Sequence, residues 1–171
     1  PTLQKDYTIE VYEDNIGMVQ TRWTHLNENL SLLTRVQAFA LNGHFAIEQK
    51  ARNDAGFFIN FNGTGGVWRK ECIINAGNWE IDTITEDLDL SYRAQMKGWK
   101  FIYLKDITTP AELPENISAL KSQQFRWTKG AIETAKKLLP SVWKSDLSLR
   151  LKLQSTLHLT NNFVFPFVIR I

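Results

Sequence analysis

Three carboxylates stand close together in the segment Thr85-Glu86-Asp87-Leu88-Asp89, at the start of a predicted helix. Acidic residues near a helix N-terminus are stabilised in the ionised form, so one of them could accept a proton from a substrate hydroxyl. Glu86 and Asp87 are adjacent and point about 100° apart around a helix, which argues against the facing carboxyl pair of a glycosidase. The segment predicts one ionised base with a low pKa. The alternative is a helix start in which Thr85 is the N-cap and the acidic residues only offset the helix dipole.

A second group of polar and aromatic residues occurs in Gln123-Gln124-Phe125-Arg126-Trp127. Gln123, Arg126 and Trp127 are three and four residues apart, so they share one face of a helix. Arg can bind phosphate through paired hydrogen bonds, and Trp offers a flat apolar surface to a sugar ring. This face therefore suits a phosphorylated, sugar-bearing ligand. The alternative is an ordinary helix with Trp127 in the core and Arg126 in water.

A glycine-rich loop, Asn62-Gly63-Thr64-Gly65-Gly66, follows the apolar run Phe57–Phe61. Glycine lets the backbone approach a ligand closely. The loop lacks the Gly-Lys-Ser/Thr of a P-loop, and Trp68 stands where a dinucleotide fingerprint needs a small residue. We therefore expect a ligand-binding turn of neither type.

Composition limits the class of protein that could carry these residues. The chain has 171 residues, 43% of them hydrophobic and 12% aromatic, which favours one ordered domain with a sizeable core. The single cysteine, Cys72, excludes a disulfide framework and a cysteine-based zinc site. No run of about 18 apolar residues occurs, so no complete membrane-spanning helix is predicted within the chain.

Charge is divided unevenly along the chain. Residues 121–171 hold nine Lys/Arg and two Asp/Glu, although the whole chain carries only +2. A basic segment of this kind indicates an anionic partner such as nucleic acid, phosphate groups or a membrane surface. Trp143 and several leucines alternate with the basic residues, which is typical of an amphipathic helix lying on a membrane. The alternative is a solvated helix face.

The hydrophobic pattern predicts a layered α/β fold, because long helical segments separate three strand candidates. The strands are expected over Ile16–Thr21, Phe57–Phe61 and Trp99–Leu104, with a stiff turn at Pro110–Pro114. The helices are expected at residues 1–13, Leu30–Arg52 with an apolar stripe, Lys70–Ala76, Thr85–Lys97, Asn116–Leu139 with a break or bend at Gly130 and a stop at Pro140, and from near Ser145 onwards.

The order of these motifs resembles the family 2 processive glycosyltransferases: cellulose synthase, hyaluronan synthase and the mannan or glucomannan synthases. The resemblance rests on Thr85-Glu86-Asp87, on Gln123-Gln124-Phe125-Arg126-Trp127, and on the loop Phe61–Arg69 that precedes both. The segments Met18–Trp23, Asp87–Gln95 and Gly98–Lys100 are similar to the mannan-synthase-like branch of the family. The resemblance covers essentially the whole chain.

The resemblance implies the C-terminal part of a GT-A-type, Rossmann-like catalytic domain that transfers a hexose from a nucleotide sugar, GDP-mannose or UDP-glucose, to a growing β-linked polysaccharide with inversion. Asp87 would be the general base, oriented by Thr85 and Glu86. The acceptor would lie against Asn62, Gly63, Thr64 and Trp127, and the nucleotide diphosphate against Gln123 and Arg126. The enzyme would be membrane-bound with its catalytic part facing the cytoplasm, and nucleic acid is not an expected partner.

Residues 1–115 are then expected to form the acceptor-side part of the catalytic domain, and residues 116–171 the amphipathic interface helices leading to the start of a transmembrane segment near Phe163. The family's Asp-x-Asp, which holds Mg²⁺ or Mn²⁺, does not occur in its expected place, and Asp87-Leu88-Asp89 is not assigned to metal. The chain alone is therefore expected to be inactive. Asn78 stands where the resemblance predicts a glycine. The competing hypotheses are a non-catalytic, membrane-peripheral module that binds glycan or lipid and, least favoured, a nucleic-acid-binding domain.

Overall fold

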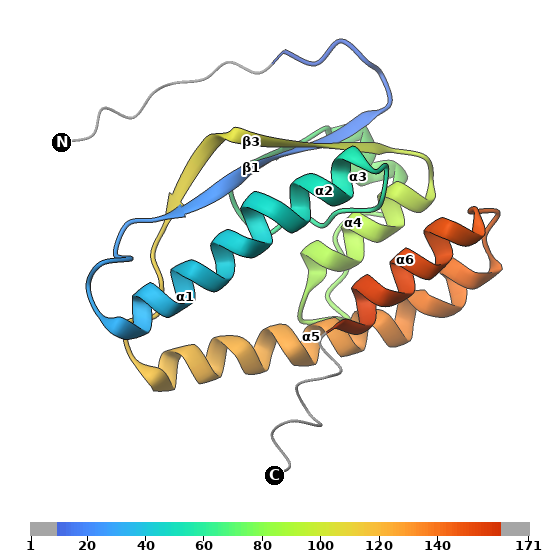
Figure 1. Cartoon of the computed structure of the whole chain (residues 1–171). Helices are drawn as coiled ribbons and strands as arrows, with labels where there is room; N and C mark the ends of the chain where they lie inside the picture. The colour runs from blue at the N-terminus through green and yellow to red at the C-terminus, as the bar shows by residue number, and fades with distance from the viewer. Residues whose placement is uncertain (1–9, 162–171) are drawn as a thin grey trace.

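A three-stranded sheet lies at the centre of the computed structural model, which describes residues 10–161 (Figure 1). Its strands are β1 (Ile16–His25), β2 (Gly66–Trp68) and β3 (Lys100–Ala111), in the order β2-β1-β3. Strand β1 pairs antiparallel with β2 and parallel with β3. The expected α/β class is confirmed, and the strand predicted from Ile16 extends four residues further than expected.

The turn predicted at Pro110–Pro114 is wrong at its start. Strand β3 continues through Pro110, which is the pairing partner of Thr24 in β1. Proline cannot donate a hydrogen bond, but β3 is an edge strand and has no partner on its outer side among the described residues.

The segment Phe57–Phe61 is buried but is not a strand, contrary to the prediction. Its backbone hydrogen bonds go to side chains instead of to a neighbouring strand. Gln95 Oε1 accepts from the Ile59 N–H at 3.1 Å, and Gln95 Nε2 donates to the Ile59 carbonyl at 2.7 Å. Ser91 Oγ accepts from the Phe61 N–H at 2.9 Å. Buried polar side chains therefore satisfy this backbone, which the apolar run alone did not indicate.

The long helix predicted over Leu30–Arg52 is present as one continuous rod made of α1 (Leu32–Gly43), the π-helical turn η1 (His44–Glu48) and α2 (Gln49–Asp54). Ser31 is the N-cap and forms a capping box with Thr34. In η1 the N–H of Gln49 donates to the carbonyl of His44, five residues back.

Most of the apolar stripe of this helix faces outward and not into the core. Leu32, Val36, Phe39 and Ile47 are 75%, 59%, 83% and 70% exposed, and we call them the outer face of α1 and η1. The inner side of α1 is mainly polar, and its groups are satisfied. Thr34 Oγ1 donates to the Glu28 carbonyl at 3.1 Å, and Gln37 Nε2 to the Pro114 carbonyl at 2.9 Å.

Two further helices, α3 (Lys70–Asn75) and α4 (Glu86–Met96), agree with the predicted ranges to within one residue at each end. Asn78, in the turn after α3, adopts a left-handed conformation with φ of 65°. Asparagine tolerates this region better than most residues, so Asn78 supplies the conformation for which the resemblance predicted a glycine.

The two C-terminal helices are α5 (Ile117–Lys144) and α6 (Leu149–Thr160), which pack against each other (Figure 1). Helix α5 begins where predicted, with Asn116 as its N-cap, but it neither breaks at Gly130 nor ends at Pro140. Helix α6 begins at Leu149 with Ser148 as its N-cap, later than predicted. Within residues 10–161, none of the helices combines the length and the hydropathy needed to cross a membrane.

Two predicted features lie largely or wholly outside the described residues. Of the helix expected over 1–13, only residues 10–13 are described, and they are not helical. The apolar run from Phe163 to Ile169 lies entirely outside.

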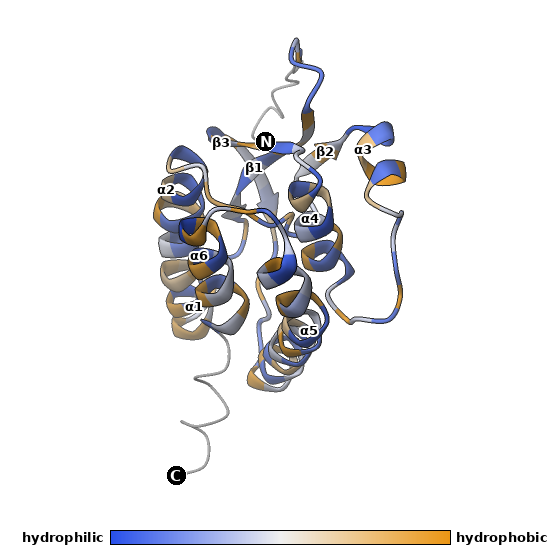
Figure 2. Cartoon of the chain, turned by 90° about the vertical axis from the view of Figure 1, so that its right-hand side faces the viewer, coloured by the Kyte–Doolittle hydropathy of each residue, from blue (hydrophilic) through white to orange (hydrophobic). Residues whose placement is uncertain are grey.

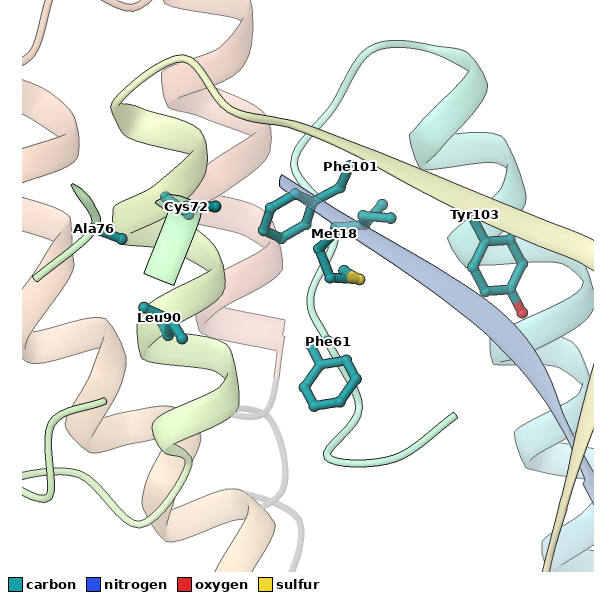
Figure 3. Close-up of a cluster of buried hydrophobic side chains, with 9 residues drawn as sticks. Met18, Phe61, Cys72, Ala76, Leu90, Phe101 and Tyr103 are labelled. Atoms are coloured by element: carbon teal, nitrogen blue, oxygen red, sulfur yellow. The ribbon is translucent and has the colours of Figure 1, made fainter. Parts of the chain in front are cut away.

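Two hydrophobic clusters hold the elements together. The first collects side chains from β1, β3, α3, α4 and the 57–61 segment, and Figure 3 shows Met18, Phe61, Leu90 and Phe101 gathered within it. The second lies among α4, α5 and α6 and contains Phe58, Tyr92, Ala135, Leu138, Val142 and Leu159. Helix α4 contributes to both clusters, so it is fixed against the sheet and against α5 at once.

Candidate active site

The glycine loop is held in place by polar side chains of β1. Gln20 is fully buried, and its Nε2 donates to the carbonyls of Thr64 at 3.0 Å and Gly65 at 2.9 Å. Its Oε1 accepts from the N–H of Asn62 at 3.1 Å. Trp23 Nε1 also donates to the Thr64 carbonyl at 3.2 Å. We call these contacts the Gln20 clamp.

Close backbone approach explains Gly65 within this loop. Its φ is +70°, and a methyl group on it would lie 3.1 Å from Cβ of Thr109 and 3.2 Å from Oγ1 of Thr21. Thr21 Oγ1 donates to the Gly65 carbonyl at 2.5 Å. A side chain at position 65 would therefore be strained and would push the loop away from the sheet.

Asp87 lies in the first turn of α4, opposite the glycine loop. Its Oδ1 accepts from the N–H of Leu88 at 2.7 Å. Its Oδ2 is close to the loop, because a methyl group added to Gly63 would lie 3.6 Å from that oxygen. The carboxylate therefore borders the predicted ligand-binding turn.

The low pKa expected for the base at this helix start is wrong for Asp87. The pKa of the Asp87 carboxyl is raised from 3.8 to about 6, chiefly by burial and to a smaller extent by the negative charge of Glu86, although the hydrogen bond from the Leu88 N–H acts to lower it. Desolvation outweighs the favourable helix terminus here. A carboxylate with a pKa near 6 is largely ionised at neutral pH and is a stronger base than an exposed Asp.

Neither Thr85 nor Glu86 forms a side-chain hydrogen bond with Asp87. Thr85 is the N-cap residue of α4, but its hydroxyl does not cap the helix and lies 3.1 Å from Oγ1 of Thr134 on α5. Glu86 is exposed and acts on Asp87 through its charge. Any orienting effect of these two residues is therefore indirect.

One cleft of about 590 Å³ brings the glycine loop, the start of α4 and α5 together. The residues predicted from the sequence that line it are Asn62, Gly63, Thr85, Glu86, Asp87, Arg126 and Trp127. Two predicted residues do not line it: Thr64, whose carbonyl is held by the Gln20 clamp, and Gln123. The neighbouring Gln124 lines the cleft instead.

Trp23, His44 and His158 also line the cleft. None of them was predicted as a site residue, because a lone Trp or His is more often a core or surface residue than a ligand-binding one. His158 Nδ1 and the Tyr92 hydroxyl form a 2.7 Å hydrogen bond. Burial, helped by the charge of Arg52, lowers the pKa of His158 to about 3, so this imidazole is neutral near pH 7. His44 Nδ1 pairs with Glu48 Oε2 at 2.9 Å. These three residues lie far apart in the sequence, so spacing did not indicate that they converge. Only Trp23 carried a signal, because it belongs to the segment Met18–Trp23 that resembles the mannan-synthase-like branch.

The described residues contain one acidic cluster with the spacing of a metal site, formed by Glu80, Asp82 and Asp89. The ammonium of Lys137 fills it, with Nζ 2.5 Å from Glu80, 2.8 Å from Asp82 and 3.1 Å from Asp89. Arg93 also pairs with Asp89 at 2.7 Å. Burial acts to lower the pKa of Lys137, but the hydrogen bonds to these carboxylates outweigh it and raise the pKa. Because a permanent cation occupies the centre, the cluster does not fit Mg²⁺ or Mn²⁺.

Known proteins match this chain over nearly its whole length. Residues 6–171 match the family model described as "Glycosyl transferase family group 2". The chain is 40% identical over 163 residues to the rice protein named "Probable glucomannan 4-beta-mannosyltransferase 4", and 37% identical over 163 residues to the Arabidopsis thaliana protein named "Probable glucomannan 4-beta-mannosyltransferase 10". Each alignment covers 95% of this chain and 29% of the relative. The chain therefore spans less than a third of the length of these relatives.

Proposed function

Because the chain belongs to glycosyl transferase family group 2, we propose that it is part of an inverting hexosyltransferase that extends a β-linked polysaccharide from a nucleotide sugar. The names of its relatives favour a mannosyl donor and a glucomannan-type product. We further propose that residues 1–115 form the acceptor side of the catalytic domain and that residues 116–171 form interface helices. One observation carries the proposal: Asp87, the glycine loop and the Arg126–Trp127 segment line a single cleft.

The proposed reaction assigns each wall of the cleft a task. The carboxylate of Asp87 accepts the proton of an acceptor hydroxyl, whose oxygen then attacks the anomeric carbon of the donor sugar. The bond from that carbon to the diphosphate breaks on the opposite side, so the configuration inverts. Arg126 pairs with the leaving diphosphate, and the indole of Trp127 stacks on the acceptor sugar.

A divalent ion, when bound, would neutralise charge on the leaving diphosphate. The described residues offer no suitable site, because Lys137 fills the cluster of Glu80, Asp82 and Asp89. No step assigned to this chain depends on such an ion.

Replacing Asp87 by Asn in the complete enzyme tests the proposal. The Asp87→Asn variant should lose roughly 10²- to 10⁴-fold in sugar transfer, because an amide cannot accept the proton, while binding of the nucleoside diphosphate is retained. The matched control is Asp146→Asn, an exposed Asp between α5 and α6, which should keep full activity. Unchanged synthesis by Asp87→Asn would remove Asp87 from the mechanism.

The pH profile of the same enzyme gives a second readout. Burial raises the pKa of Asp87 to about 6, so the base form is lost as the pH falls through about 6. Below that value kcat/KM should fall about tenfold per pH unit. Because the pKa of Asp87 is raised on folding, this carboxyl lowers stability increasingly as the pH rises from about 4, and the full loss is reached above about pH 6. Asp87→Asn should therefore be no less stable than the parent at pH 7.5. Thermal unfolding at that pH therefore separates lost chemistry from lost structure.

We also propose that the enzyme rests on a membrane surface, with this part of the chain facing the cytoplasm. The support is the outer face of α1 and η1, together with exposed Phe125 on α5 and Leu153 and Leu157 on α6. Figure 2 shows hydrophobic and hydrophilic stripes alternating along these helices. Exposed apolar residues beside a basic segment favour an anionic lipid surface.

The same surface supports the alternative of a non-catalytic module that binds glycan or lipid. That module would bind vesicles but would need no base in the cleft, so the Asp87→Asn experiment separates the two proposals.

A further inference from the structure

Helix α5 approaches the start of α4 unusually closely at Gly130. A methyl group on Gly130 would lie 2.6 Å from Cγ2 of Thr85 and 2.9 Å from both its backbone nitrogen and Oγ1. Side-chain carbons are not found that close to other heavy atoms. The two helices can therefore keep this spacing only with glycine at position 130.

Two polar contacts secure the same approach. Thr134, one turn after Gly130, is fully buried, and its Oγ1 lies 3.1 Å from Oγ1 of Thr85. Glu133 Oε2 accepts from the N–H of Ile84 at 3.2 Å. Gly130, Glu133 and Thr134 thus form a seat for residues 84–85, which we call the Thr85 seat.

The Thr85 seat lies between the groups that the cleft brings together. Asp87 follows Thr85 by two residues on α4, and Trp127 and Arg126 precede Gly130 by three and four residues on α5. A change in the separation of α4 and α5 at the seat directly changes the distance from the Asp87 carboxylate to the indole of Trp127 and the guanidinium of Arg126.

Alanine is a better helix former than glycine, and α5 has alanine at the buried positions 131 and 135. Close approach, not helix stability, therefore explains the glycine.

We infer that Gly130 and Thr134 are positioning residues that set the distance between the base and the α5 wall of the cleft. This inference rests on the proposed function, because it gives Asp87 and the α5 wall their tasks. Neither residue touches the substrate. They act through Thr85, which explains how Thr85 can influence Asp87 without a hydrogen bond to it.

The Gly130→Ala variant of the complete enzyme tests the inference. The added methyl group should push the start of α4 away from α5 and lower kcat at least tenfold, since misplaced catalytic groups lose rate steeply. The KM for the donor should change less than threefold, because Arg126, which pairs with the diphosphate, keeps its place on α5. The matched control is Gly43→Ala, a helical glycine with no other group within 4 Å of an added methyl, which should keep kcat. A parent-like kcat for Gly130→Ala would overturn the inference.

A compensating change makes the test specific. Thr85→Ser removes Cγ2, the atom closest to the added methyl group, and keeps the hydroxyl that faces Thr134. The Gly130→Ala/Thr85→Ser double variant should have a kcat at least twofold above that of Gly130→Ala, and the recovery should be partial because the 2.9 Å approach to the backbone nitrogen of residue 85 remains. No recovery would overturn the seat as the cause.

A third variant decides the matter if Gly130→Ala does not fold. Thr134→Val keeps the shape of the side chain but loses the hydroxyl, so kcat should fall at least threefold, while Thr134→Ser should match the parent. A parent-like Thr134→Val would overturn the inference. Full activity of Asp87→Asn would overturn the proposed function. If Asp87→Asn is inactive but the Gly130→Ala and Thr134→Val variants keep the parent kcat, only the positioning role of Gly130 and Thr134 is overturned.

Discussion

The glycine loop and the first half of α5 face the same cleft, but the chain holds them in very different ways. The loop is fixed by the Gln20 clamp and by Thr21, with donors and acceptors from the interior of the sheet. Residues 117–129 of α5 are mostly exposed, with Ile117 and Phe125 at 53% and 68%. Only after Gly130 does α5 pack into the second hydrophobic cluster. One wall of the cleft is thus held by hydrogen bonds to buried side chains of the sheet. The other wall, residues 117–129, is a largely exposed stretch of helix that precedes the Thr85 seat.

Lys137 pairs with acidic residues on and before α4 from the part of α5 that follows Gly130, and its loss should have the largest effect on stability. Lys137→Met would leave the fully buried Asp89 and Glu80 to share Arg93, and would leave Asp82 beside them without a cation. The free energy of unfolding should fall by about 3 kcal/mol in urea titrations of the purified protein. The neighbouring Lys136 is exposed, and Lys136→Met should change the free energy of unfolding by less than about 0.5 kcal/mol. Equal losses in the two variants would contradict this assignment.

The Gln20 clamp should come next. Gln20→Met keeps the length of the side chain but leaves the Asn62 N–H without its partner and removes two of the bonds to the loop carbonyls. We expect a loss of about 2 kcal/mol in thermal or urea unfolding. Gln124→Met, the same change on the exposed wall, should cost less than about 0.5 kcal/mol. If both variants lost the same amount, the contrast between the two walls would disappear.

The smallest effect on the free energy of unfolding is expected for exposed residues in the first half of α5. Phe125→Ser should alter the free energy of unfolding by less than about 0.5 kcal/mol, because the ring is 68% exposed. The same change should weaken binding to anionic vesicles about tenfold in sedimentation assays if this side rests on lipid. Ile74→Ser is the control. Ile74 is exposed on α3, which both views place at the opposite end of the molecule, and this variant should bind vesicles like the parent (Figures 1 and 2).

Most helices could be predicted because their signals are local. Thr85 and Gly98 bracket α4, and Asn116 caps α5 through a hydrogen bond from Ala119. Where the predicted elements are wrong, the reason is a contact with a distant part of the chain. Helix α5 continues past Pro140 because Leu138 and Val142, on either side of it, are both buried in the second hydrophobic cluster. The strand predicted at Phe57–Phe61 fails because Gln95 and Ser91 take the hydrogen bonds that a neighbouring strand would have taken.

The candidate site was predictable as a set of residues but not as an electrostatic environment. Spacing on a helix face predicted that Gln123, Arg126 and Trp127 lie together, and of these Arg126 and Trp127 line one cleft with Asn62 and Gly63 of the glycine loop, whereas Gln123 does not. It could not show that burial at Asp87 overrides the helix terminus, because burial depends on α5 and on the glycine loop. Likewise, the carboxylate of Asp89 is neutralised by Lys137, which lies 48 residues further along the chain.

The π-helical turn at His44–Glu48 constrains how this chain can change in length. A π turn holds one residue more than an α turn, and its wider loop takes up that residue without rotating the helix that follows. Deleting one residue at this turn would therefore restore a regular helix and leave the faces of α1 and α2 in register. Deleting one residue between Phe39 and Gly43 would instead rotate the preceding part of α1 by about 100° relative to α2, so that Thr34 and Gln37 would leave the carbonyls of Glu28 and Pro114. A one-residue deletion should therefore be tolerated at the π turn and not within α1.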